Sequence, residues 1–191
     1  MKNEKETRQF NAPELRAETD EAGNTVLTGY AAVFGELSED LGGFKEIIHR
    51  NAFDNVLNDD VVFLLNHDNN IVFGRSSSGT LKLSVDERGL KTEVKMPNTG
   101  PANDAVELMK RGDLSKMSFG FFIESDKWKE SERGFIREVT EVKRLTDVSL
   151  VTRPAYPQTS ASIRSLEEFK YESRDNVQAR KNKLRILKLK K

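Results

Sequence analysis

The chain is built from short runs of β-branched and aromatic residues, and Gly, Asn, Asp or Pro closes several of them. Runs of this length and composition are typical of strands in a packed β domain. They lie at 26–34, 44–48, 61–65, 72–75, 80–85, 90–96, 117–124, 135–145 and 147–152. Two helices are expected among them, at 52–57 and 101–111. The pattern predicts a mainly β fold with inserted helices, a closed or half-closed barrel of mostly antiparallel strands.

The two ends of the chain differ from this middle part. Residues 1–23 are rich in charge and poor in apolar side chains, so we expect a flexible N-terminal arm, with order starting near Asn24. Residues 163–191 carry apolar positions at loosely helical spacing among Lys and Arg, which predicts a basic helical tail. The intervening residues 24–162 are expected to form one domain.

Charge is unevenly distributed although the whole chain is neutral. Residues 161–191 hold ten Lys and Arg side chains against four Asp and Glu, so the rest of the chain carries an equal excess of negative charge. An acidic body with a single Trp does not suit a groove that binds nucleic-acid strands. We therefore expect no nucleic-acid partner, although a small nucleic-acid-binding barrel is an alternative that the basic tail suggests.

Composition also excludes several kinds of chemistry. The chain has no cysteine, which rules out a disulfide framework, a thiolate metal site and a cysteine nucleophile. Its mean hydropathy is −0.63, and no apolar run approaches the length of a membrane span, so a soluble intracellular protein is expected. Phosphate-loop, dinucleotide and zinc-protease motifs are absent. We predict no cofactor and no transition-metal site, while an Asp/Glu site for a hard cation stays open.

Three residues are candidates for acid, base or nucleophile. Of the two histidines, His67 ends an apolar run beside a polar turn expected at 68–70, and His49 precedes an expected helix; either position also suits an ordinary surface or capping residue. Ser118 begins a bulky apolar run and is the best candidate nucleophile, although, taken alone, an ordinary hydroxyl at a strand start is the commoner explanation. Asp147 adjoins a core strand and needs a partner, which a backbone amide or Arg153 could also provide.

The candidates lie within short motifs that occur in a fixed order along the chain. These are Gly29-Tyr30-Ala31-Ala32-Val33-Phe34, Phe44-Lys45-Glu46-Ile47-Ile48 followed by Ala52-Phe53, Leu64-Leu65-Asn66-His67-Asp68, Gly89-Leu90, Ser118-Phe119-Gly120-Phe121, and Asp147-Val148-Ser149-Leu150-Val151 before Pro154-Ala155. Together they resemble the tailed-phage prohead proteases of the Hong Kong type, serine proteases that mature capsids. The resemblance covers most of residues 24–163.

This family looks related to herpesvirus assemblin, so the resemblance implies an assemblin-like β-barrel with surrounding helices. It also implies site roles: His67 as general base, Ser118 as nucleophile and Asp147 as the acid that orients the imidazole. Family members often carry Glu at the third position, and the shorter Asp147 reaches less far. In assemblin-like sites the oxyanion donors follow the third triad member, which points to the loop around Thr152 and Arg153.

The same resemblance implies partners and a place of action. The expected substrates are the scaffolding segment of the major capsid protein and the protease itself, cut by acyl transfer inside the assembling prohead in the cytoplasm of a bacterial host. A prophage origin and a homo-oligomer are left open, and no membrane partner is expected. The main alternative is a non-catalytic capsid-assembly or scaffold-like protein built on the same barrel.

Overall fold

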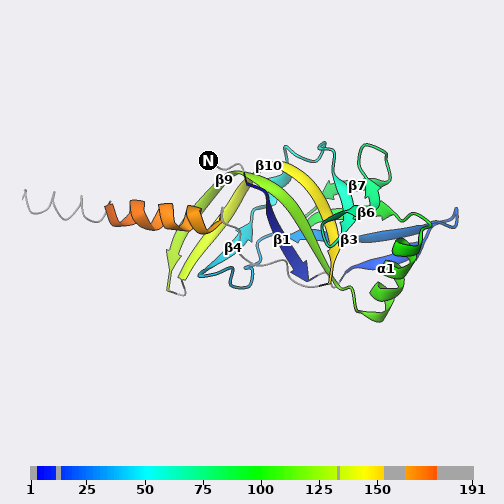
Figure 1. Ribbon diagram of the computed structural model, residues 1–191. Coiled ribbons are helices and arrows are strands. Elements are labelled where there is room, and N and C mark those ends of the chain that lie inside the picture. Colours follow the sequence, from blue (N-terminus) through cyan, green and yellow to red (C-terminus); the bar gives the residue numbers. More distant parts are fainter. Residues whose placement is uncertain (1–3, 12–13, 133, 153–161, 176–191) are drawn as a thin grey trace, which may run out of the picture. The chain divides into compact units, whose positions relative to one another are not determined.

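Two long strands, β9 (Lys116–Ser131) and β10 (Gly134–Val151), form an antiparallel ribbon in the larger of two sheets (Figure 1). The computed structural model describes residues 4–11, 14–132, 134–152 and 162–175. The chain divides into two compact units, Met1–Pro157 and Gln158–Lys191. Both sheets lie in the first unit; in the second, residues 162–175 form a helix within the expected basic tail. Residues 176–191 of that tail lie outside the described residues.

The larger sheet uses β10 as its central strand. On one side β10 pairs with β9, and β9 pairs with the edge strand β1 (Glu6–Asn11), both antiparallel. On the other side β10 runs parallel to β4 (Phe44–Ile48) in its first half and to β5 (Val62–Leu65) near its end. The strand β6 (Asp68–Arg75) completes this sheet as the antiparallel partner of β5.

The smaller sheet has four antiparallel strands in the order β2–β3–β8–β7. They are β2 (Arg16–Thr19), β3 (Thr25–Val33), β7 (Leu81–Val85) and β8 (Gly89–Lys95). The hairpin expected from 80–85 and 90–96 is confirmed as β7–β8. The mainly β prediction holds, but the strands of the described residues form two sheets and not a closed barrel, and two pairings of β10 are parallel.

One expected helix is confirmed and the other is shorter than expected. The helix α1 (Gly100–Arg111) buries Ala102 and Ala105 and ends at Gly112, whose positive φ of 83° allows its amide to cap the last carbonyls. At the other position a single 3-10 turn, η1 (Arg50–Phe53), replaces the helix expected at 52–57. None of the helices in the described part of the chain is long and apolar enough to cross a membrane.

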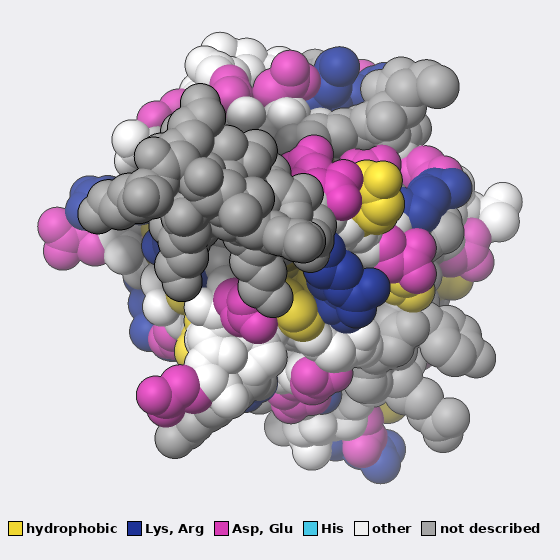
Figure 2. Space-filling view, turned by 90° about the vertical axis from the view of Figure 1, so that its left-hand side faces the viewer, with side chains coloured by type: hydrophobic (Ala, Val, Ile, Leu, Met, Phe, Trp, Pro, Cys, Tyr) yellow, Lys and Arg dark blue, Asp and Glu magenta, His cyan; other side chains and the backbone are white. Residues whose placement is uncertain are grey.

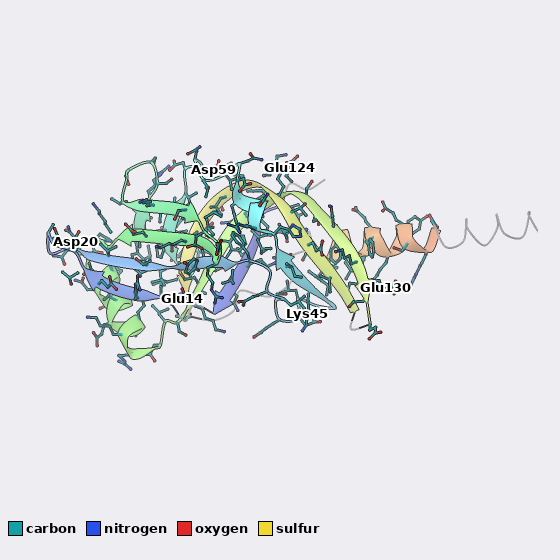
Figure 3. The ribbon with its side chains drawn as sticks, turned by 180° about the vertical axis from the view of Figure 1, so that it is seen from behind. Glu14, Asp20, Lys45, Asp59, Glu124 and Glu130 are labelled. Carbon is teal, nitrogen blue, oxygen red and sulfur yellow. The ribbon has the colours of Figure 1, made fainter. Side chains whose placement is uncertain are left out.

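The N-terminal residues contradict the expected flexible arm. Residues 6–11 and 16–19 form β1 and β2, one strand in each sheet, so order begins well before Asn24. Figure 3 shows Asp20 at the tip of the β2–β3 hairpin, where its carboxylate accepts backbone N–H groups of Ala22 and Asn24. The charges of this segment are therefore compatible with strands because several of them find partners.

A single apolar core draws on both sheets. Leu27 and Leu90 come from the smaller sheet, and Phe63 and Phe119 from the larger one, all without exposed surface. The ring of Phe53 packs edge-on against Phe119 with centroids 5.4 Å apart. One face of the larger sheet is thus committed to the core, which leaves its opposite face for polar side chains.

Candidate active site

The face of the β9–β10 ribbon that points away from the core carries the polar candidates. Along β9, Phe119 and Phe121 enter the core, so Ser118 and Gly120 lie on the opposite face. In the antiparallel register Ser118 lies opposite Ser149 of β10. Residues that face each other in this way put their side chains on the same side of the sheet.

A β-bulge brings Asp147 to that same face. Leu145 pairs with Phe121 and Asp147 pairs with Gly120, so Thr146 is an extra residue on β10. Without it, simple alternation from the buried Leu145 would direct Asp147 into the core. Bulges commonly redirect a side chain beside an active site, and this one places the carboxylate two strand positions from Ser118.

Gly120 provides the space that this carboxylate occupies. A Cβ at this position would lie closer to Asp147 Oδ1 than any real Cβ contact, and 2.9 Å from Thr146 Oγ1. The Thr146 hydroxyl lies 2.8 Å from Asp147 Oδ1 and 2.9 Å from the Gly120 carbonyl oxygen, so the bulge also fixes the carboxylate. The glycine of the Ser118–Phe121 motif is therefore required by packing beside the acid.

His67 is presented by a tight hairpin turn between β5 and β6. Asn66 and His67 both have positive φ, 53° and 59°, as the two central residues of a type I′ turn require. The polar residues 68–70, which looked like the turn in the sequence, are instead the start of β6. Asn66 anchors the turn to the end of β10: its N–H donates to Leu150 O at 2.8 Å, and its Oδ1 accepts from Thr152 N–H at 3.0 Å.

The turn places the imidazole between the acid and the serine. His67 Nδ1 hydrogen-bonds Asp147 Oδ2, and His67 Nε2 lies 2.7 Å from Ser118 Oγ. With a carboxylate on Nδ1, the Nδ1–H donates to the acid and Nε2 is left to accept a proton from the serine. The three residues singled out in the sequence thus form one continuous chain of hydrogen bonds, and the shorter Asp147 does reach His67.

The carboxylate is buried and strongly ionised. Burial alone raises the pKa of Asp147, but hydrogen bonds from His67 and Lys5 outweigh it and lower the pKa to about 2. Lys5 Nζ lies 2.5 Å from Asp147 Oδ1, on the oxygen that does not face the histidine. The acid is therefore an anion at any physiological pH, as a group that orients an imidazole and stabilises its protonated form must be.

Sequence reasoning missed several residues that contact these three. Ser149 Oγ lies 3.2 Å from His67 Nδ1, and its place two residues after Asp147 is the one signal that could have identified it. Lys5 and the Arg8 carbonyl, which accepts from Ser118 Oγ at 2.9 Å, come from the expected flexible arm. No local pattern could have joined them to residues more than a hundred positions away.

The two residues expected to stabilise the oxyanion, Thr152 and Arg153, are not seen in that role. Thr152 follows β10, and its N–H is already donated to Asn66 Oδ1. Arg153 lies outside the described residues. Among the residues that are described, no group of three His, Asp or Glu side chains is arranged to hold a metal ion.

Comparison with known proteins adds a family and a fold. A family model described as "Caudovirus prohead serine protease" matches residues 12–172. Among solved structures, the bacteriophage T4 capsid assembly protease gp21 is similar, with a TM-score of 0.50 and 13% sequence identity over 78% of this chain and 99% of that one. At that identity the match supports the fold alone. No curated protein matches this sequence.

Proposed function

Because this chain belongs to the caudovirus prohead serine protease family, we propose that it is the serine endopeptidase that matures a phage capsid, with Ser118, His67 and Asp147 as its catalytic triad. The observation that carries the proposal is the unbroken contact from Asp147 through His67 to Ser118 Oγ. Each of the three sits on a different strand or turn, so their meeting is a product of the whole sheet.

The mechanism follows from this geometry. His67 Nε2 takes the Ser118 proton as Oγ attacks a peptide carbonyl, and the imidazolium then returns the proton to the leaving amine. Asp147 holds Nδ1–H throughout and stabilises the positive ring. The resulting acyl-enzyme is released when water, deprotonated by the same histidine, attacks the ester. Every proton in the cycle has a place among these side chains, and no cofactor is needed.

The tetrahedral oxyanion needs backbone or side-chain donors, and we place them in the loop that begins at Thr152 and Arg153. Thr152 N–H can serve in this way only after it leaves Asn66 Oδ1, so Thr152 has to move away from Asn66 when substrate binds. Such tightening of an apo site on substrate binding is common in enzymes.

The proposed substrates are the scaffolding segment of the major capsid protein and the protease itself, with cleavage taking place in the assembling capsid within the bacterial host. Capsid proteins are the partners that the family description supports. Where side chains are coloured on the face drawn in Figure 2, acidic and basic ones are interspersed, so this part of the surface gives no support to a nucleic-acid role.

The decisive experiment labels the nucleophile. A fluorophosphonate probe should modify Ser118 in the full chain, and Ser118→Ala or His67→Ala should each lower capsid-protein cleavage by on the order of 10⁶-fold, with little further loss in the double variant. Ser115→Ala and His49→Ala are controls, because both side chains are exposed and lie outside the strands, Ser115 just before β9 and His49 just after β4, and both should retain the wild-type rate.

Two results would overturn the assignment. Cleavage at the wild-type rate in Ser118→Ala would remove the serine from the mechanism. A folded protein that takes up no probe and leaves capsid protein intact would favour the non-catalytic assembly protein instead.

A further inference from the structure

The position of Asp147 depends on an irregular stretch of β10 that lacks one neighbouring strand. On the side opposite β9, β10 pairs with β4 as far as Val139 and with β5 only from Asp147 onward. All four shifts in the β9–β10 register fall within this stretch, and the last of them is the bulge at Thr146. Because none of the described strands pairs with the stretch on its open side, another group has to hold the bulge in place.

The side chain of Asp59 takes the place of the missing strand next to the bulge. Asp59 is half-buried, lies between η1 and β5, and is labelled in Figure 3. Its Oδ2 accepts the Leu145 N–H at 2.8 Å. Leu145 directly precedes the inserted Thr146, so the contact is made at the point where the register changes. An ionised carboxylate accepts hydrogen bonds and donates none, and it therefore stabilises the register that presents an N–H at this point.

Asp59 is itself fixed to the base of the hairpin that carries His67. Its carbonyl oxygen accepts the Ser76 Oγ–H at 2.9 Å, and Ser76 directly follows β6. Ser76 Oγ in turn accepts the Val61 N–H at 2.8 Å, one residue before β5 begins. The loop therefore joins the open end of the β5–β6 hairpin to β10. Through Asp59, the strand with the acid and the hairpin with the base are held in a fixed relation.

The next residue in the sequence is also an acid, but it makes a different contact. Asp60 is exposed and forms an ion pair with Arg75 at the surface, and such pairs contribute little to stability. Asp59 directs its carboxylate to a backbone amide of β10, and a hydrogen bond to a charged acceptor is about twice as strong as one between neutral groups. Of these two adjacent acids, Asp59 is the one whose hydrogen bond reaches the strand of the catalytic acid.

We propose that Asp59 is a positioning residue of the active site. By accepting the Leu145 N–H it holds the bulge, and the bulge holds Asp147 beside His67. This inference rests on the proposed peptidase function and adds a residue outside the triad on which the rate depends. Asp59 should then matter for the reaction only while Asp147 is present, whereas a residue that merely stabilises the fold would matter equally without it.

A double-mutant cycle tests this dependence. Full-length wild type, Asp59→Ala, Asp147→Ala and the double variant are compared for the rate of fluorophosphonate labelling of Ser118. We expect Asp59→Ala to slow labelling about ten- to a hundredfold, because a displaced catalytic group loses rate steeply. In the Asp147→Ala background the same change should alter the slow residual rate by less than about twofold. Equal slowing in both backgrounds would overturn the proposal, and so would a wild-type rate in folded Asp59→Ala.

Two conservative variants separate the hydrogen bond from the charge, and they cover the case in which Asp59→Ala does not fold. Asp59→Asn keeps an oxygen acceptor at the same reach, so labelling should stay within about threefold of wild type. Asp59→Glu keeps the charge but moves the acceptor by one methylene, so labelling should be slowed at least about tenfold. If Asp59→Glu were labelled as fast as Asp59→Asn or faster, the charge would be responsible and the proposal would fail.

Nuclear magnetic resonance measures the position of the acid without turnover. In protein with ¹⁵N-labelled histidine, the His67 Nδ1–H gives a resonance far downfield while it is donated to Asp147, and His49→Ala identifies it as the signal that remains. We expect this resonance to move or disappear in Asp59→Ala and Asp59→Glu. It should stay unchanged in Asp59→Asn and in the matched control Asp60→Ala, which should also keep the wild-type labelling rate. An unchanged resonance in folded Asp59→Ala would overturn the proposal.

The two measurements distinguish failure of the positioning role from failure of the peptidase assignment. If no form of the protein takes up the probe but the His67 resonance changes in Asp59→Ala, the peptidase assignment fails while the positioning of Asp147 stands. If the probe labels wild type and Asp59→Ala equally fast, the positioning role fails alone.

Discussion

Asp147 reaches His67 through an irregularity of a single residue. Because Thr146 is inserted into β10, the strand changes which face Asp147 occupies, and the carboxylate meets the imidazole on the same side as Ser118. A sequence pattern of alternating residues carries no sign of such a bulge. The sequence singled out the three residues, but only the paired register explains how the shorter acid makes its contact.

At Gly120 the same geometry predicts a specific defect. Gly120→Ala should lower the rate of substrate cleavage at least about a hundredfold, because the added methyl group displaces Asp147 from beside Thr146 and a misplaced catalytic group loses rate steeply. Steady-state hydrolysis by the folded variant measures this. The matched control is Gly100→Ala, since nothing lies within 4 Å of a Cβ at that position. Equal rates for the two variants would contradict the packing argument.

Ionisation of Asp147 predicts how stability depends on pH. Its pKa is about 2 in the folded protein against an ordinary value of 3.8, so the folded state is stabilised above pH 4 and loses that contribution as pH falls toward 2. The contribution is roughly 2 kcal/mol at neutral pH. Urea unfolding of wild type and Asp147→Asn between pH 6 and 3 tests this: the difference in unfolding free energy should shrink on acidification. A difference that stays constant would contradict it.

At the scale of elements, the sequence predicted helices and strands correctly where residues within one segment determine its structure. The helix α1 and the β7–β8 hairpin were predictable because periodicity, a helix-ending Gly112 and a polar turn all act locally. The turn beside His67 was expected at 68–70, but positive φ at Asn66 and His67 places it at those two residues, and 68–70 begin β6. Its anchor, Thr152, lies too far along the chain to be read from the pattern.

The prediction of a flexible N-terminal arm was wrong for a related physical reason. Glu6 and Arg8 read as solvated charges, but they are buried because Glu46 and Arg137, on two other strands, neutralise them. Amino-acid composition gives the number of charged side chains but does not show which of them form ion pairs. A buried ion cluster is therefore the kind of feature that sequence patterns interpret as disorder.

The cluster makes its own prediction. Arg137 is 2% exposed and contacts Glu6, Glu46 and Asp126, so Arg137→Met leaves three buried carboxylates without their shared partner. Removing one partner of a buried ionic group typically costs about 3–5 kcal/mol of unfolding free energy, which urea denaturation would measure. The control is Arg75→Met, because Arg75 pairs with Asp60 at the surface and should matter far less. Similar losses of unfolding free energy in both variants would show that the buried cluster stabilises the fold no more than a surface ion pair does.

At the scale of the whole molecule, the strand-rich composition predicted the class of fold but not its closure. A closed or half-closed barrel was expected from the number of short strands; the described strands form two sheets, and β10 divides its pairing between β9 on one side and β4 and β5 on the other. The parallel pairs join segments that are far apart in sequence, and such register is set by the assembled core. Asp59, labelled in Figure 3, adds one such long-range contact by accepting the Leu145 N–H at 2.8 Å.

The distribution of charge leads to a prediction about the C-terminal tail. Residues 176–191 contain seven Lys and Arg and no Asp or Glu, and they follow the end of the family match at residue 172. Basic segments of this kind bind acidic surfaces and are screened by salt. Deleting residues 176–191 should leave peptide hydrolysis within a few-fold of wild type and lower the number of protease copies incorporated into proheads, more so at low ionic strength.

Quantitative blotting of purified proheads and a peptide assay measure the two effects separately. The matched control replaces the seven basic residues with Gln and keeps the length of the tail; it should behave like the deletion if charge is responsible. Normal incorporation of the truncated protein would reduce the tail to a solubilising segment. Loss of hydrolysis together with lower thermal stability would instead show that these residues belong to the folded protease. A tail that only binds a partner should not change the unfolding of the sheet.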